Sequence, residues 1–451
     1  MVLGGAALMA TGLAPSRGRA DDAEIDRAIW SLLSPRRPDA LPVGDAARFL
    51  READDLRAVP GLILAHRYGN RRWSGAVMAE LTGEDPINGW FEWMLWQEAH
   101  PEVRPTAGYL DMKRAVLLSI DRDFDVFLRP EHLAPEAARI RVEEIAWGGV
   151  RKDGIPSLDD PDRIPATDAT WLRDDDLVFG VAIGGDVRAY PLRIMGWHEM
   201  FNETIGGVPL ALAYCTLCGA GILYETAVEG RAEPFVFGSS GFLYRSNKLM
   251  FDRQTHTLWN QFNGEPVVGP LAGSGIRLKR RPVTIAPWGD WRRRNPATTV
   301  LSLNTGHRRD YGSGVVYRAY FESSELMFPA LVPDRAHAAK DYVFAISQPG
   351  AARAWPLEVF RGGAVINDRV GGLDVVLVGD AAGRTVRAYE RGGRRFAASG
   401  EVLVEGSRRW RIGEEALEGE DGARLARVAG HIAYWFAWAN QGGAAAELYR
   451  G

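Results

Sequence analysis

Apolar residues recur at helical spacing through roughly the first third of the chain. The segments IDRAIWSLL, VGDAARFLREADDL, RWSGAVMAELTG and YLDMKRAVLLSI place them three or four positions apart, with Pro and Gly breaks between the segments. This spacing gives each helix one apolar face, which can be buried against its neighbours. It predicts a helical domain over residues 22–140.

The pattern changes after a stretch rich in Gly, Pro and Asp, IRVEEIAWGGVRKDGIPSLDDPDRIPA, which is typical of a linker. From about residue 165 onward, short runs of Val, Leu, Ala, Phe and Tyr alternate with Gly turns. Such runs predict β-strands. The fold class expected for the whole chain is therefore α+β, a helical domain followed by a β-rich region.

The β-rich region contains an internal repeat. The 50 residues from Asp176 align without a gap with the 50 residues from Asp341, at an offset of 165. The identical positions include Asp176, Phe179, Arg188, Ala189, Pro191, Leu192, Asn202, Gly206, Gly207, Leu212, Tyr224 and Glu225. The alignment predicts two copies of one β unit, the first within residues 141–330 and the second within 331–451.

The two copies differ in chemistry at one turn. Cys215 and Cys218, the only cysteines of the chain, fall opposite Asp380 and Gly383, and His198 falls opposite a glycine. In the second copy the segment VVLVGDAAGRTVRAYE predicts a hairpin, so the cysteines of the first copy are also expected in a hairpin turn. The second copy is therefore expected to be a degenerate one that has lost the chemistry of the first.

Composition narrows the class of protein without identifying it. With 46% hydrophobic and 25% charged residues, the chain is typical of a soluble globular protein. A net charge of −4 without a basic stripe gives no reason to expect nucleic acid as a partner. No internal apolar run is long enough to predict a transmembrane span. The expected partner is a small molecule or a protein of unidentified kind.

The N-terminal residues resemble a secretory signal. An apolar stretch runs from Val2 to Leu13, and Gly18 and Ala20 form a small-x-small cleavage pattern, although the usual basic start is missing. We therefore expect a leader over residues 1–21 and a periplasmic or extracellular protein. A flexible Ala/Gly leader is the alternative.

The Cys-x-x-Cys turn predicts a metal centre first. Two thiolates on a tight turn can hold one ion, and Gly219 would supply the positive φ that the turn needs. His198 and His256 lie in the same copy and could complete the ligand set. Thiolate and imidazole together suit zinc or copper.

Other residues near these ligands have secondary roles in this hypothesis. Glu199 could act as a base beside a metal-bound water. Asp252 and Arg253 could hydrogen-bond to the ligands and orient them. Nearby methionines that could serve a soft copper ion are Met195, Met200 and Met250.

Two alternatives to the metal centre stay open. Cys215 and Cys218 could form the redox pair of a thiol–disulfide oxidoreductase acting outside the cytoplasm. The Gly-rich sequence that follows argues against the helix that carries such a motif in thioredoxin-like proteins. The other alternative is a non-catalytic binding or scaffold protein in which the cysteine turn only stabilises the hairpin.

Two long segments resemble a known family. RAYPLRIMGWHEMFNETIGGVPLALAYCTLCGAGILYE and FGSSGFLYRSNKLMFDRQTHTLWNQFNGEPVVGPLAG are similar to the bacterial and archaeal family called domain of unknown function 3179, over about residues 140–345. The family turn is usually Cys-Pro-x-Cys-Gly, and here Thr216 replaces the proline, which removes some rigidity from the turn. The resemblance implies a shared site around His198, Cys215 and Cys218 in an exported protein, and it implies no particular reaction.

Overall fold

The computed structural model describes residues 20–84, 89–332, 337–442 and 446–451, so nearly all of the predicted leader lies outside the described residues. The chain divides into two compact units. One consists of residues up to Trp90 together with Glu102–Lys113, and the other of Phe91–Pro101 and Arg114–Gly451.

The first unit is helical, as the apolar spacing predicts. In α1 (Asp22–Leu33) the side chains of Ile25, Ile29 and Leu32 are fully buried, and Asp21 caps the helix by accepting a hydrogen bond from the Ala23 amide. The other helices of this unit are α2 (Val43–Ala53), η1 (Leu56–Ala58), α3 (Val59–Tyr68) and α4 (Arg71–Thr82).

Further helical segments follow along the chain at α5 (Trp90–Ala99), α6 (Tyr109–Ile120), η2 (Arg122–Val126), α7 (Pro130–Leu133) and η3 (Val142–Glu144). Strands begin directly afterwards, so the expected α+β fold class is confirmed. Among the helices of the described residues, none is long and apolar enough to cross a membrane.

The predicted repeat is present in the second unit. Copy one consists of β4 (Leu177–Ile183), β5 (Asp186–Pro191), α8 (Leu192–His198), β6 (Met200–Ile205), β7 (Val208–Cys215) and β8 (Ala220–Glu225). Copy two consists of β16 (Tyr342–Gln348), β17 (Ala351–Pro356), η5 (Leu357–Phe360), β18 (Ala364–Val370), β19 (Leu373–Asp380) and β20 (Thr385–Glu390). Apart from the helices and the start of β18, the bounds of corresponding elements differ by 165, as the sequence alignment requires.

The structure extends the repeat beyond the aligned segment, at a second offset of 147. In copy one, β13 (Arg280–Arg281) pairs with β8, β14 (Thr284–Pro287) pairs with β4, α9 (Trp288–Arg294) follows, and β15 (Thr299–Leu301) joins β5 in parallel. In copy two, β25 (Arg424–Val428), β26 (His431–Tyr434), α11 (Trp435–Gln441) and β27 (Ala446–Leu448) repeat every one of these pairings. Both helices begin with the pattern Trp-x-x-Trp.

Hydrogen bonds from an asparagine side chain to the backbone are also duplicated, buried in copy one and part-buried in copy two. The Asn202 side chain accepts a hydrogen bond from the Phe237 amide and donates to the Phe237 carbonyl, and Asn367 does the same with Phe396. A backbone amide or carbonyl that loses its partner inside the protein is costly. Each asparagine therefore fixes the position of the phenylalanine segment that lies next to its strand. The two copies therefore share their internal bonding as well as their strand order.

The two copies meet reciprocally around one core. Phe179 of copy one and Phe344 of copy two belong to the same buried apolar cluster. β8 lies beside β26 of the other copy, and β20 lies beside β14. The Tyr434 amide donates to the Cys218 carbonyl at 2.7 Å, so the tip of the cysteine hairpin is docked against copy two.

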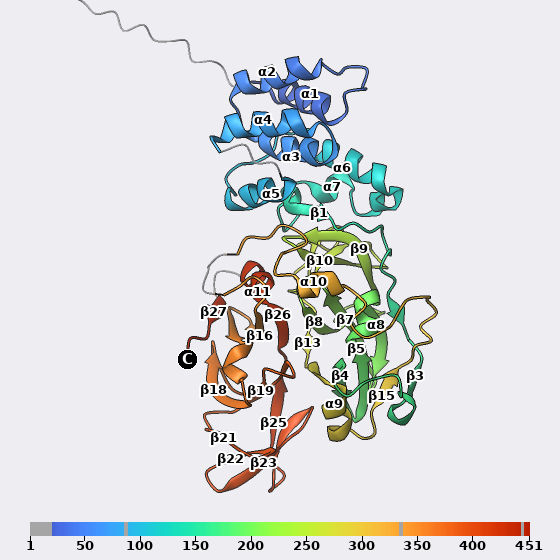
Figure 1. The fold of residues 1–451 in the computed structure, drawn as a ribbon, viewed down its shortest axis with the longest axis vertical. Coiled ribbons are helices and arrows are strands. Elements are labelled where there is room, and N and C mark those ends of the chain that lie inside the picture. The colour runs from blue at the N-terminus through green and yellow to red at the C-terminus, as the bar shows by residue number, and fades with distance from the viewer. Residues whose placement is uncertain (1–19, 85–88, 333–336, 443–445) are drawn as a thin grey trace, which may run out of the picture. The chain divides into compact units, whose positions relative to one another are not determined.

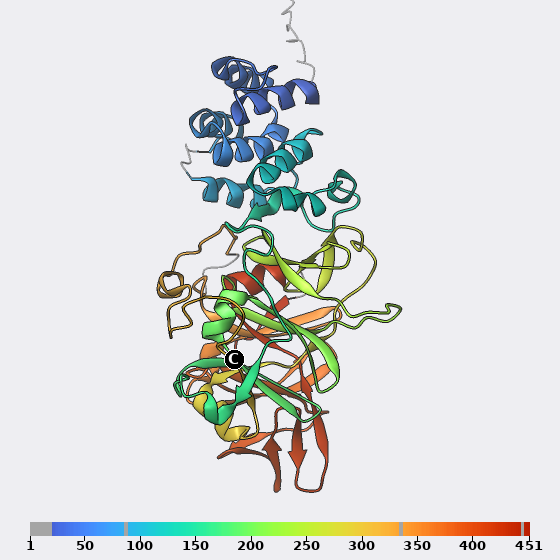
Figure 2. The same ribbon diagram turned by 90° about the vertical axis from the view of Figure 1, so that its right-hand side faces the viewer.

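Two further sheets complete this unit (Figure 1). One joins β1 (Ile145–Trp147), β9 (Phe237–Tyr244), β10 (Asn247–Asp252), β11 (Leu258–Asn260) and β12 (Glu265–Val268). The other continues from β18–β20 and β25 through β24 (Ala416–Gly419), β23 (Arg408–Ile412), β22 (Val402–Glu405) and β21 (Ala397–Ser399), whose long red hairpins are seen again in Figure 2. The short strands β2 (Leu158–Asp159) and β3 (Arg163–Pro165) pair with β6 and β15.

Candidate functional site

Cys215 and Cys218 lie at the turn that joins β7 to β8. Both are free thiols, with 2% and 0% of their surface exposed. The Cys218 amide donates to the Cys215 carbonyl at 3.2 Å, and Gly219 has a φ of +60°. The corresponding turn of copy two has the same shape, because Arg384 has a φ of +51°. The expected hairpin is thus present, and glycine meets the need for positive φ without strain.

The Cys218 thiol is held on two sides. It donates to the Ser246 carbonyl at 3.5 Å, at the turn between β9 and β10, where Arg245 and Ser246 both have positive φ. Burial raises the pKa of Cys218 well above its usual value, and a hydrogen bond with the Cys215 thiol and the charge of Glu199 act in the same direction. The two sulfurs are therefore close neighbours, and Cys218 is held in its protonated form.

A buried ion pair lies beside the thiols. The Glu199 carboxylate accepts a hydrogen bond from the Thr216 hydroxyl at 2.7 Å and pairs with the Lys248 ammonium at 3.1 Å. Only 7% of the Glu199 side chain and 4% of the Lys248 side chain are exposed. Glu199 follows α8 with a φ of +53°, which turns the chain sharply and places its carboxylate next to the cysteine turn. A charged pair and a hydroxyl thus adjoin two thiols in a water-poor environment.

Two tyrosines from the segment around α10 (Arg318–Glu322) also contact this site. The Tyr320 hydroxyl donates to the Leu217 carbonyl at 2.7 Å, and the Tyr317 hydroxyl lies 3.4 Å from Glu199. The charge of Glu199 is the main cause that raises the pKa of Tyr317. The segment around α10 is thus fastened to the cysteine turn by hydrogen bonds.

His198 is directed elsewhere. Its Nδ1 is 2.9 Å from the Pro156 carbonyl, and its Nε2 is 2.6 Å from the Tyr311 hydroxyl. Burial lowers the pKa of His198 to about 4, so the ring is neutral near pH 7. Both ring nitrogens have partners, and neither partner is a thiol.

Of the remaining predicted residues, Asp252 and Arg253 have structural partners. Asp252 accepts hydrogen bonds from Thr255 and from the Trp259 indole, and so shapes the turn from β10 to β11. Arg253 makes a two-pronged ion pair with Asp153. His256 lies in the same turn with a φ of +57°, and its Nδ1 has no hydrogen-bond partner among the described residues.

The predicted ligands are not gathered around one point. Among the described parts of the chain, no group of three or more His, Cys, Asp or Glu side chains could hold a metal ion. The structure brings together Cys215, Cys218 and Glu199, and it does not bring His198 or His256 to them. The zinc or copper centre stays a prediction.

Lys248 and Thr216 belong to this site and were not predicted from the sequence. A comparison of the copies could have found Thr216, because Glu199 and Thr216 fall opposite Ala364 and Ala381 and so share the asymmetry that singles out the cysteines. Lys248 has a different signal, a lone cation within the strand sequence NKLMFD.

Comparison with known proteins gives one match. The model of the family described as "Protein of unknown function (DUF3179)" matches residues 152–442 of this chain, which covers copy one and copy two as far as α11. Searches of curated proteins and of solved structures found no match.

Proposed function

Because this chain belongs to the DUF3179 family, whose description assigns no activity, its function has to be inferred from its site, and we propose that Cys215 and Cys218 form a dithiol–disulfide redox centre. The observation that carries this proposal is the pair of free, hydrogen-bonded thiols on one turn. The buried Glu199 carboxylate beside the two thiols supports the proposal.

The proposed reaction balances with a disulfide as co-reactant. The Cys215 sulfur attacks a substrate disulfide and forms a mixed disulfide, and one substrate thiol leaves. The Cys218 sulfur then attacks the Cys215 sulfur, forms the Cys215–Cys218 disulfide and releases the second substrate thiol. The protons of the two cysteines end on the two released thiols, so the protein is oxidised and the substrate is reduced.

Glu199 is proposed as the proton carrier for Cys218. A thiol must lose its proton before it attacks, and burial holds the Cys218 proton tightly. The Glu199 carboxylate is close enough for its charge to act on Cys218. Glu199 can therefore receive the proton and return it to the leaving thiol.

The protonated state of Cys218 also sets the expected direction of the reaction. Oxidising dithiols owe their high potential to a stabilised thiolate in the reduced form. A buried thiol with a raised pKa lacks that stabilisation, so its disulfide is relatively favoured. We expect a reductant with a potential nearer the about −270 mV of thioredoxin than the about −120 mV of DsbA.

The test is equilibration of the full chain in glutathione buffers, followed by mass spectrometry of the intact protein. We expect the loss of two hydrogen atoms in the wild type and none in Cys215→Ser. Cys218→Ser should instead trap a glutathione adduct on Cys215. A wild-type protein whose thiols stay reduced across the whole buffer series would contradict the proposal and would favour a scaffold role.

A soft metal ion held by the two thiolates is the second candidate. The side chains of Met200 and Met250 belong to the same buried cluster as Cys215 and Cys218, and thioethers with thiolates suit Cu(I). Titration of the reduced protein with Cu(I) and with Zn(II), against a competing chelator, separates the candidates. Stoichiometric copper binding that Cys218→Ser abolishes would favour the metal centre over the redox pair.

A further inference from the structure

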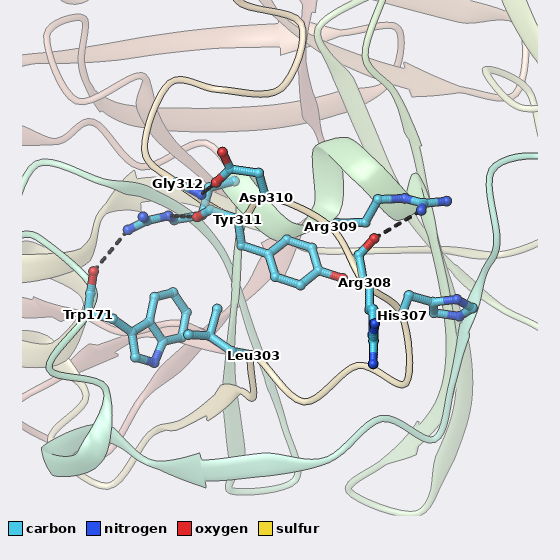
Figure 3. Close-up of a pocket in the computed structure, with 9 residues that line it drawn as sticks. Trp171, Leu303, His307, Arg308, Arg309, Asp310, Tyr311 and Gly312 are labelled. Carbon is cyan, nitrogen blue, oxygen red and sulfur yellow. Dashed lines mark hydrogen bonds between the residues drawn. The ribbon is translucent and has the colours of Figure 1, made fainter.

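An open pocket of about 700 Å³ lies on the loop that follows β15 (Figure 3). Its walls include Trp171, Leu303, Arg308 and Tyr311. The volume is in the range that accommodates a small molecule. Tyr311, the hydrogen-bond partner of His198, lines this pocket, whereas Cys215, Cys218, Glu199 and Lys248 do not.

The Trp171 wall and the Tyr311 wall are joined by the guanidinium of Arg193, which also lines the pocket. Arg193 donates to the Tyr311 carbonyl at 2.6 Å and to the Trp171 carbonyl at 2.9 Å. It also pairs with Asp176 at 2.9 Å, and only 13% of its side chain is exposed. The positive charge of Arg193 is therefore neutralised, and its role is to fix the indole wall relative to the tyrosine wall.

The loop itself is anchored by Tyr311. Its hydroxyl lies 2.6 Å from His198 Nε2 and 2.6 Å from the Thr305 hydroxyl. The Trp197 indole donates to the Asp310 carbonyl at 2.8 Å just before it. The pocket is thus shaped before any ligand arrives, which lowers the entropic cost of binding.

The charge on this loop is not balanced locally. Arg308 and Arg309 are exposed, and no ion pair among the described residues involves either of them. The Asp310 carboxylate accepts from the Gly312 amide, and Figure 3 shows it on the side of the loop opposite to the Arg308 side chain. The charge of Arg309 also helps to lower the pKa of His198.

Apolar side chains lie on the same side of the loop as the Arg308 side chain. In Figure 3 the Arg308 side chain extends toward the side where Leu303 and the Trp171 indole lie, whereas Arg309 reaches away from them. Leu303 is 39% exposed and adds apolar surface to the pocket wall formed by Trp171. Arg309 donates to the Arg308 carbonyl at 3.1 Å and so positions the backbone of its neighbour.

From this juxtaposition we propose that the pocket binds a small organic anion with a flat apolar body. The anionic group is held by Arg308, and the apolar body lies against Trp171 and Leu303. Carboxylates and phosphates share the geometry that a guanidinium recognises, so both belong to this ligand class. The site is independent of the thiol centre.

The test is isothermal titration calorimetry of the full chain with benzoate and phenyl phosphate as probes, and with benzyl alcohol and inorganic phosphate as matched controls. We expect both aromatic anions to bind, and the two controls to bind at least about tenfold more weakly. Arg308→Gln should weaken the aromatic anions by about tenfold or more, as expected for the loss of a charge-assisted hydrogen bond. Leu303→Ala should weaken them while leaving the response to inorganic phosphate unchanged.

Arg395→Gln is the matched control, because Arg395 is also exposed and lies outside the pocket. It should leave binding unchanged, as should Cys215→Ser. Equal affinity of the wild type and Arg308→Gln for phenyl phosphate would overturn the proposal. Equal binding of benzyl alcohol and benzoate would also overturn it, since the pocket would then bind apolar molecules without regard to charge.

Discussion

The buried Glu199–Lys248 pair predicts a large loss of stability when one partner is removed. The perturbation is Lys248→Met, which keeps most of the side-chain volume and deletes the charge. At 3.1 Å, two unit charges attract by about 5 kcal/mol with an effective dielectric constant of about 20. Leaving one member of such a pair buried and alone costs about 3–5 kcal/mol.

Glu199 keeps two hydroxyl neighbours, Thr216 and Tyr317, after the ammonium is removed. We therefore expect Lys248→Met to destabilise the second unit by about 3 kcal/mol, at the lower end of that range. Glu199→Gln with Lys248→Met removes both charges together, so the double variant should be more stable than the sum of the single changes by about 2 kcal/mol or more.

The assay is urea unfolding of the full chain followed by tryptophan fluorescence, since the second unit contains fully buried tryptophans such as Trp259 and Trp288. Arg318→Met is the control. The Arg318–Glu322 pair has a similar distance of 3.0 Å, but its side chains are 72% and 66% exposed, so its loss should have little effect. A Lys248→Met protein as stable as this control, or strict additivity in the double variant, would refute the reasoning.

Three further predictions concern buried polar groups elsewhere. Burial raises the pKa of Glu98 to about 8, so the folded state holds a proton that the unfolded state has lost, and stability should fall as pH rises from about 4.5 to about 8. Urea midpoints of Glu98→Gln should lack this fall. The pKa of His198 is lowered to about 4, so the unfolded state takes up a proton first, and stability should fall as pH drops from about 6.5 to about 4. Thermal melting of His198→Gln should be flatter over that window. Asn202→Ala removes the partner of a buried backbone amide and carbonyl and should cost about 2–4 kcal/mol in urea unfolding, whereas Asn367→Ala, whose hydrogen bonds are part-buried, should cost less. A loss below about 1 kcal/mol in Asn202→Ala would show that water replaces the amide.

Much of the fold could be predicted because its signals are local. Helical spacing in IDRAIWSLL specifies which face of α1 is buried, and it holds whatever that face packs against. The hairpin at Cys215 and Cys218 could be inferred from copy two because turn geometry depends on a few consecutive residues. The extension of the repeat through β14 and β26 could not be predicted from a gapless alignment, because the intervening chain differs in length between the copies. The offset therefore changes from 165 to 147.

The sequence by itself determined the helices, the duplicated β unit and the pairing of two thiols on one turn, since each depends on residues close together in the chain. Only the tertiary structure decided the partners of the chemically active side chains. His198 meets Tyr311 across 113 residues, and Glu199 meets Lys248 across 49. Neighbouring residues 198 and 199 are directed to different sites because Glu199 leaves α8 with positive φ, and the direction of a side chain after such a turn depends on what packs around it.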